Sequence, residues 1–386
     1  NTISGYYSIT AKCVTDTIKG YDTLGMQYAD KYKGVDQRLG LLSLAGVKYI
    51  TVAHNSQVAK DVSSMGDVPY GVEKLRKKGN ITLYKNKYAL PFAYAYDSYM
   101  TEQQYEQLNG IGKEQAMLAQ IILNQHPADK EIQHNEQRNG PDIQTISLPE
   151  TRISSPKGKK YADITVPVEK DKETYLYFKN LVYHGKKNGE DNFILTGRKG
   201  TKGILVTQND IQQKIHIQST FNPYYFGRKD YIIKINHQTS KEKEKVRLNF
   251  LSPGEYEFDD ISLITVPKKD VFAKLKERKK NSMKQIQYEG NHFRGVYHAK
   301  KEQILCVTIP YSKGWKATVN GKRAKIYKAN GMFMGIVMKK GTQNVKLDYE
   351  TPGLKIGACI SLLAWIGLGI YGLYLEKYRK KLLNQC

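Results

Sequence analysis

The chain has 386 residues, of which 61 are Lys or Arg and 37 are Asp or Glu, giving a formal charge of +24 at pH 7. This length permits two or three domains with proper hydrophobic cores, so the fold does not depend on disulfides. The four cysteines have no CxxC spacing, which argues against a zinc or redox site and leaves open whether Cys13 pairs with Cys306.

The positive charge points to anionic partners such as lipid headgroups, phosphate-bearing polymers or polyprenyl-phosphate carriers. Nucleic acid is the other standard partner of a basic chain. The basic runs at 157–160, 241–245 and 276–280 lie far apart, however, and no nucleic-acid recognition module accompanies them, so we expect none to bind. A solvated, charge-rich surface is the simpler explanation for part of the excess.

The chain begins at Asn1 with neither a charged n-region nor an apolar h-region, which predicts a fragment whose translocation depends on upstream membrane spans. Residues 1–125 then predict a small α/β domain. Its pattern favours a short helix ending at Gly46, followed by a strand from Val47 to Val52.

Later in this segment, aromatic alternation predicts strands at 81–86 and 88–97 that pair through a turn at Asn86 and Lys87. Thr101 and Gln104 have the spacing of a capping box, which predicts a helix starting there. A second helix is expected over 112–125.

Residues 126–160 are polar and proline-rich, as is typical of a linker or a long surface loop. Residues 161–267 have seven short strand-like runs separated by turns, which predicts one β-sandwich. A helical crossover is expected at 268–284. Residues 285–350 return to strands, as a second β-sheet domain or as the completion of the sandwich, and Asn320-Gly321 predicts a type I′ hairpin.

Residues 354–376 predict a transmembrane helix, because 356–375 form an uncharged apolar run long enough to cross a bilayer core. The basic tail, 377–386, predicts a cytoplasmic C-terminus with residues 1–353 outside, although the lysines before the helix weaken that bias. The small residues Gly357, Ser361 and Gly369 favour close packing against other spans. The fold class is therefore α+β, mainly β, with one or two jelly-roll-like sandwiches and one C-terminal span.

The sequence motifs that could indicate a catalytic, cofactor or metal site are weak. The only GxGxxG, at 367–372, lies inside the predicted span and is a false dinucleotide match. Asp259 and Asp260 are hard oxygen donors, but adjacent strand residues face opposite ways, which disfavours a metal site. His292 and His298 would share a strand face, but they are too far apart for a chelate and have no carboxylate or cysteine beside them, so we expect surface histidines.

Tyrosine is abundant, with 29 residues, clustered for example at 174–178 and 222–231. Aromatic faces suit sugar rings, but tyrosine also favours pleated sheets, so packing is the stronger interpretation. No catalytic, cofactor-binding or metal-binding residue is assigned to this segment, no cofactor is expected in it, and its substrate-binding residues are not identified.

Three stretches together resemble the C-terminal part of the YfhO-type bacterial membrane proteins. They are RLGLLSLAGVKYITV, KYALPFAYAYD and the end from PYSKGWKATVNGKRAKIYKANGMFMGIVM to YETPGLKIGACISL. The match runs through nearly the whole chain in order, with little that is specific over 120–300. Within the tail pattern, the hairpin from Trp315 to Gly321, Asn330, Gly335, Gly341 and Tyr349 are expected to serve turns and packing.

The resemblance implies a multi-span glycosyltransferase of the GT-C type, which takes sugar from a polyprenyl phosphate and glycosylates cell-envelope polymers such as lipoteichoic acid. Its catalytic carboxylate would lie on an early outer loop upstream, so the present segment is expected to bind acceptor or act as a scaffold. The partners expected are membrane lipid, an anionic envelope polymer, and the polyprenyl-phosphate sugar through the upstream spans. The alternative is a non-enzymatic, membrane-anchored β-sandwich that binds wall polymer or a protein.

Overall fold

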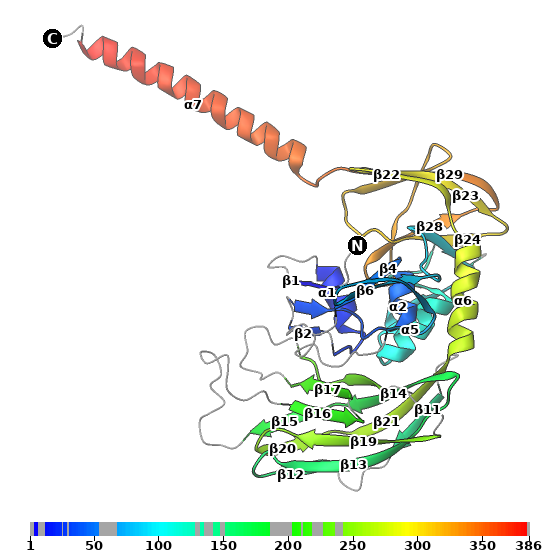
Figure 1. Cartoon of the computed structure of the whole chain (residues 1–386). Coiled ribbons are helices and arrows are strands. Elements are labelled where there is room, and N and C mark those ends of the chain that lie inside the picture. The colour runs from blue at the N-terminus through cyan, green and yellow to red at the C-terminus, as the bar shows by residue number, and fades with distance from the viewer. Residues whose placement is uncertain are drawn as a thin grey trace.

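The computed structural model describes residues 4–6, 12–24, 26–28, 31–53, 68–127, 132–134, 142–146, 151–185, 203–209, 211–217, 227–235 and 242–383. It is mainly β, with several stacked sheets, a few helices between them and one C-terminal helix that projects from the body (Figure 1). This confirms the expected fold class.

The layer next to the projecting helix is a five-stranded antiparallel sheet of order β22-β23-β29-β25-β26. Its strands are β22 (Lys284–Glu289), β23 (His292–Ala299), β25 (Trp315–Val319), β26 (Lys322–Ala324) and β29 (Gly341–Tyr349). Asn320 and Gly321 join β25 to β26 with φ of +49° and +78°. Two positive φ values in a two-residue loop define the expected type I′ turn, which is confirmed.

The next layer is a seven-stranded mixed sheet of order β10-β8-β9-β27-β28-β24-β7. Its strands are β7 (Ala93–Tyr96), β8 (Ser98–Thr101), β9 (Ile121–Leu123), β10 (Gln133–His134), β24 (Gln303–Val307), β27 (Tyr327–Ala329) and β28 (Phe333–Met338). Phe293, Leu305, Met334 and Leu347 are among the side chains that form the core between these two sheets.

This pairing changes the expected organisation. Residues 1–125 and 285–350 were expected in separate units, but β7 pairs with β24 and β9 pairs with β27, so the two segments build one sheet. Within 285–350, the strands β26 and β27 also follow each other in sequence but lie in different sheets. Local alternation reveals a strand but not its distant partner, which explains both differences.

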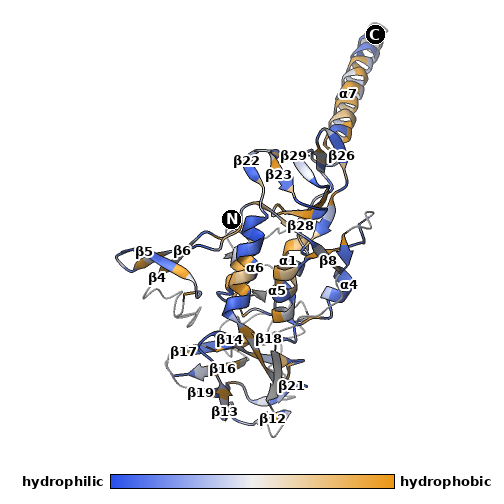
Figure 2. Cartoon of the chain, turned by 90° about the vertical axis from the view of Figure 1, so that its right-hand side faces the viewer, coloured by the Kyte–Doolittle hydropathy of each residue, from blue (hydrophilic) through white to orange (hydrophobic). Residues whose placement is uncertain are grey.

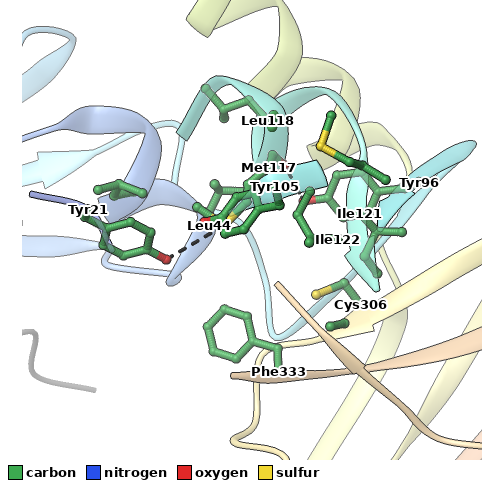
Figure 3. Packing of buried hydrophobic residues seen from close by; sticks show 14 of the residues in the cluster. Tyr21, Leu44, Tyr96, Tyr105, Met117, Leu118, Ile121, Ile122, Cys306 and Phe333 are labelled. Carbon is green, nitrogen blue, oxygen red and sulfur yellow. Dashed lines mark hydrogen bonds between the residues drawn. The ribbon is translucent and has the colours of Figure 1, made fainter. Parts of the chain in front are cut away.

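Helices cover the other face of the seven-stranded sheet. They are α2 (Leu39–Leu44), α4 (Glu102–Tyr105), α5 (Gly110–Ala119) and α6 (Lys268–Lys280). Their core includes Leu118, Ile121 and Phe333, and the Tyr21 hydroxyl donates to the Met117 sulfur at 3.7 Å within it (Figure 3). The Thr101 capping box on α4 is confirmed.

The β-sandwich lies beyond the helices, at the end of the body opposite to α7 (Figure 1). One sheet contains β11 (Asp142–Ile146), β14 (Lys172–Lys179), β18 (Tyr231–Ile235) and β21 (Asp260–Pro267). Facing it are β13 (Lys160–Pro167), β16 (Gly203–Gln208), β17 (Ile211–His216) and β19 (Lys243–Phe250), with a small sheet of β12 (Arg152–Ser155), β15 (Val182–Gly185) and β20 (Gly254–Glu257).

Strand β14 shows how its sequence joins two layers. Leu176 and Phe178 point into the sandwich core, whereas Tyr175 joins the core under the helices. Successive strand residues face opposite sides, so a strand with apolar residues at every position is buried on both faces. The sheet containing β14 is therefore an inner layer.

Two short assignments were wrong. The helix expected over 112–125 ends at Ala119, and Ile121–Leu123 form strand β9, because a short apolar run does not distinguish helix from strand. The segment 126–160, expected as a linker or a long surface loop, contributes β11 and β12, which pair with β21 and β20 of the sandwich.

A three-stranded sheet of β4 (Tyr49–Ala53), β5 (Val72–Lys78) and β6 (Ile81–Asn86) protrudes from the body. Here β6 pairs with β4 and β5, not with residues 88–97, so the expected hairpin through Asn86 and Lys87 is wrong. The remaining described elements are α1 (Lys12–Lys19) and the strands β1 (Ser4–Tyr6), β2 (Met26–Tyr28) and β3 (Lys31–Lys33).

Helix α7 (Leu354–Leu383) leaves the body at Gly353 and is apolar over most of its length (Figure 2). Of the described helices, it alone is long and apolar enough to cross a membrane, over Leu354–Lys380. None of that stretch is buried against the body, and Trp365 is 74% exposed. A bilayer would remove this apolar surface from water.

Candidate anion-binding pocket

A pocket of about 510 Å³ lies at the junction of the protruding β4–β6 sheet, helix α6 and strand β22. Its walls include five lysines and three neutral polar side chains. These are Lys48, Lys85, Lys87, Lys279, Lys284, Asn86, Ser282 and Thr308. Three stretches that are distant in sequence thus contribute lysines to the walls of one cavity.

Asn86 positions the first wall. It is buried, and its amide nitrogen donates to the Ser43 hydroxyl and the Val47 carbonyl, both at 3.0 Å. Its side-chain oxygen accepts the backbone N–H of Tyr88 at 2.9 Å. These bonds tie the end of β6 to the segment after α2, which holds Lys85 and Lys87 at the pocket wall.

The C-terminal end of α6 forms the second wall. The backbone N–H of Met283 donates to the Ala93 carbonyl at 3.0 Å, and that of Ala95 donates to the Asn281 carbonyl at 2.7 Å. The side chain of Lys279 on α6 extends to the first wall, where its Nζ donates to the Lys87 carbonyl at 2.7 Å. The chain leaving α6 is therefore fixed to the edge of the seven-stranded sheet, and Lys284 starts β22 beside the pocket.

The charge of the pocket is strongly positive. Lys87 pairs with Glu73 at 3.0 Å, but among the described residues Lys48, Lys85 and Lys284 have no carboxylate partner. The C-terminus of α6 carries only a partial negative charge of about half a unit. Unneutralised lysines in a concave site attract anions, and lysine is a standard phosphate ligand as a point charge.

Apolar groups line the rest of the pocket, among them Leu90, Pro91 and Met283. At the rim, Phe92 is 41% exposed and lies 6.0 Å from the ring of Tyr288, which is 51% exposed. Exposed aromatic faces can stack on sugar rings. The cavity therefore suits a ligand that carries both anionic groups and carbon-rich units.

The residues that the sequence offered as metal ligands have other roles. Asp259 accepts a hydrogen bond from the Asn180 amide at 3.0 Å, and Asp260 accepts one from the Ser262 hydroxyl at 3.0 Å. No group of three or more potential metal ligands occurs within the described ranges.

His292 and His298 lie on the exposed face of β23, as expected. No carboxylate is directly beside these histidines in the sequence. The strand register nevertheless places His292 opposite Asp348 on β29, with Nδ1 of the histidine 2.6 Å from Oδ1 of the aspartate. This contact lowers the pKa of Asp348. His298 bonds the Thr342 hydroxyl at 2.9 Å.

Asn330 in the tail pattern has a packing role. It is buried with φ of +47°, and its Oδ1 accepts the backbone N–H of Ile122 at 2.9 Å. Its own N–H donates to the Ile122 carbonyl at 2.9 Å. Asn330 therefore joins the β27–β28 turn to β9.

Two glycines of the tail pattern lie so close to neighbouring groups that little room is left for a larger side chain. A Cβ at Gly314 would lie 2.4 Å from the Glu350 carbonyl and 2.5 Å from the Tyr349 ring, while one at Gly335 would meet Ala329 and Leu123 at 3.3 Å. The Trp315 and Tyr349 rings lie 5.1 Å apart. The contacts of Gly314 and Trp315 fix the end of β29, from which α7 departs, whereas those of Gly335 hold β28 close to β27 and β9.

The described cysteines form no disulfide. Cys306 is fully buried beside Asn330 and Tyr96. Burial raises the pKa of its thiol to about 12. Its side chain lies within the apolar core seen in Figure 3. Cys306 is therefore a packing residue and a poor nucleophile.

Sequence reasoning did not find the pocket. It noted the basic run at 276–280, but Lys48, Lys85 and Lys284 carry no local signal that distinguishes them from other surface lysines. Their meeting depends on the non-local pairing of β4 with β6 and of β7 with β24.

The β-rich body carries one exposed apolar helix of the length and composition found in membrane-anchored proteins. The sequence profile of the family described as "Bacterial membrane protein YfhO" matches residues 1–361. The chain belongs to this family, which confirms the resemblance seen in the sequence.

A curated relative is "Uncharacterized protein YfhO" from Bacillus subtilis (strain 168), 26% identical over 348 residues. The match covers 88% of this chain but 37% of that protein, so the chain spans little more than a third of the relative's length.

Two solved structures overlap in part. The arabinofuranosyltransferase AftD from Mycobacteria is 8% identical, with 55% of this chain and 24% of that one covered and a TM-score of 0.18. Dimeric latent PorU from Porphyromonas gingivalis is 9% identical, with 79% and 32% covered and a TM-score of 0.22. TM-scores this low do not establish a shared fold.

Proposed function

We propose that this chain is the extracytoplasmic part of a multi-span membrane glycosyltransferase, and that its lysine-lined pocket binds the anionic polymer that accepts the sugar. The acceptor would be a polymer of the lipoteichoic-acid type, and the sugar donor a polyprenyl phosphate held by the upstream spans. The single observation that carries the binding role is the pocket with three lysines lacking carboxylate partners.

The chemistry of the pocket supports this role. A polyol-phosphate chain alternates phosphodiesters with carbon-rich units, and the lining of the pocket combines lysines with Leu90, Pro91 and the exposed Phe92. Lysines bind the phosphates as point charges, and the apolar wall and aromatic rim contact the polyol and its sugars. Residues 1–353 would lie outside the cell, with the basic tail in the cytoplasm.

The competing function is a non-enzymatic, membrane-anchored protein that binds wall polymer or a protein partner. It would use the same pocket and the same helix, so binding alone does not separate the two. Sugar transfer by the full-length parent does separate them.

The first test is binding of purified poly(glycerol phosphate) to the full chain. Replacing Lys48, Lys85 and Lys284 with glutamine should lower the affinity about tenfold or more, since one bond to a charged group contributes roughly 1.5 kcal/mol or more. Binding should also weaken with rising salt. The matched control replaces three exposed sandwich lysines, Lys160, Lys243 and Lys245, which removes the same charge and should change affinity little.

The second test is transfer of labelled sugar from a polyprenyl-phosphate donor to teichoic acid in membranes that carry the full-length parent. The pocket variant should raise the acceptor concentration needed for half-maximal transfer, whereas the sandwich variant should not. If the pocket variant and the sandwich variant bound poly(glycerol phosphate) with equal affinity, the pocket would not be the binding site. Binding that did not depend on salt would contradict the assignment as well. Intact binding without any transfer by the parent would favour the non-enzymatic alternative.

A further inference from the structure

The outer face of the five-stranded sheet lies at the same end of the body as α7, in both views of the molecule (Figures 1 and 2). Its inner face is covered, because Phe293, Ala317 and Leu347 pack onto the seven-stranded sheet. The alternate positions along the same strands point outward and are mostly exposed. This face is therefore the part of the body next to the predicted span.

A row of cations crosses this outer face. In the strand register, Arg294 on β23 lies opposite Lys346 on β29, Lys346 lies opposite Thr318 on β25, and Thr318 lies opposite Arg323 on β26. Directly opposed residues share a face, with Cβ atoms about 5 Å apart. Three positive side chains thus follow one line across four strands.

Few acidic groups neutralise this row. Arg294 donates to the neutral amide of Gln287 at 2.6 Å, and Arg323 has no carboxylate partner among the described residues. Lys346 contacts Asp348 at 3.1 Å, but Asp348 also bonds His292. Like charges opposed across two strands repel each other, so the pairing of Arg294 with Lys346 costs stability in the absence of an anion.

The carboxylate that follows β29, Glu350, is committed to the α7 junction. Glu350 contacts Lys316 at 2.6 Å and Lys355, one residue into α7, at 2.5 Å. These two lysines lower the pKa of Glu350 to about 2, which keeps it ionised. The junction is thus held by charge pairs, while the row of Arg294, Lys346 and Arg323 keeps its excess positive charge.

We propose that the outer face of the five-stranded sheet lies against the membrane surface, where Arg294, Lys346 and Arg323 bind the phosphate groups of anionic lipids. The placement of α7 selects a lipid source for the phosphates, because the helix holds this face near the headgroups. The attraction of a basic residue to an anionic membrane surface lowers the fraction of time that its side chain is away from the lipid headgroups about fivefold. This surface is distinct from the pocket and does not depend on the function proposed above.

The test uses the full chain in nanodiscs of phosphatidylcholine, with or without phosphatidylglycerol. Acetylation of individual lysines by a water-soluble reagent is followed by mass spectrometry. Phosphatidylglycerol should slow the modification of Lys346 about fivefold and leave Lys160 and Lys243, on the distant sandwich, unchanged.

A paired set of variants tests the row itself. R294Q/R323Q should abolish the protection of Lys346 by phosphatidylglycerol. R152Q/R247Q removes two exposed arginines from the sandwich and should retain the protection. Equal acetylation of Lys346 with both lipid compositions would overturn the proposal. So would protection of Lys346 by soluble poly(glycerol phosphate) in phosphatidylcholine nanodiscs, since the face would then bind polymer.

Discussion

Asn330 shows why a polar residue can be required inside an apolar core. Its side chain satisfies the backbone N–H of Ile122, and its left-handed φ is one that asparagine tolerates better than most residues. The sequence indicates a turn at Asn330-Gly331 but does not reveal the partner, because Ile122 is 208 residues away.

We expect Asn330→Ala to lower the free energy of unfolding by about 3 kcal/mol, through an unsatisfied buried N–H and a strained φ. Asn330→Gly removes the same hydrogen bond but tolerates the φ, so it should cost less. Denaturant titration of both variants measures the difference. If both variants were as stable as the parent chain, the bond to Ile122 would contribute nothing.

Helix α6 connects the two halves of the body. In Figure 1 it runs from the sandwich to the sheets at the other end, and Val271 and Leu275 are buried in the shared core. Near its C-terminus, the buried Arg278 donates to the Ala95 carbonyl at 2.8 Å and lies over the Tyr96 ring. The sequence predicted this helix because its apolar residues recur on one face.

The elements that could be predicted are those whose signals are local. The capping box at Thr101, the turn at Asn320-Gly321 and the sandwich strands all carry such signals. The sheet shared by β7–β9 with β24, β27 and β28, and the pocket at its edge, depend on contacts across about 200 residues, which periodicity does not encode.

For α6 we expect Leu275→Ala to lower the free energy of unfolding by about 3 kcal/mol, because a fully buried side chain is lost and a cavity remains. Lys276→Ala, on the exposed side of the same helix, should change it by less than about 0.5 kcal/mol. Hydrogen exchange should quicken in both the sandwich and the seven-stranded sheet of the Leu275 variant. Quickening in one of them alone would show that α6 does not couple the two layers.

At the scale of the whole molecule, the body and the tail place basic residues on both sides of the span. Lys339, Lys340 and Lys346 precede α7, and Lys377, Arg379 and Lys380 lie near its end. Short basic tails oppose translocation, whereas long domains cross largely regardless of their charge. The tail should therefore decide the orientation, with the pocket and the cationic row outside the cell.

Labelling of the full-length parent in intact cells with a membrane-impermeant maleimide measures this orientation. With every other cysteine of the parent replaced by alanine, Cys386 should react only after the cells are permeabilised. A cysteine placed at the exposed Thr165 of β13, in a second variant that also lacks Cys386, should react before permeabilisation. The reverse pattern would place the body in the cytoplasm, away from any envelope polymer, and would remove the acceptor role proposed for the lysine pocket.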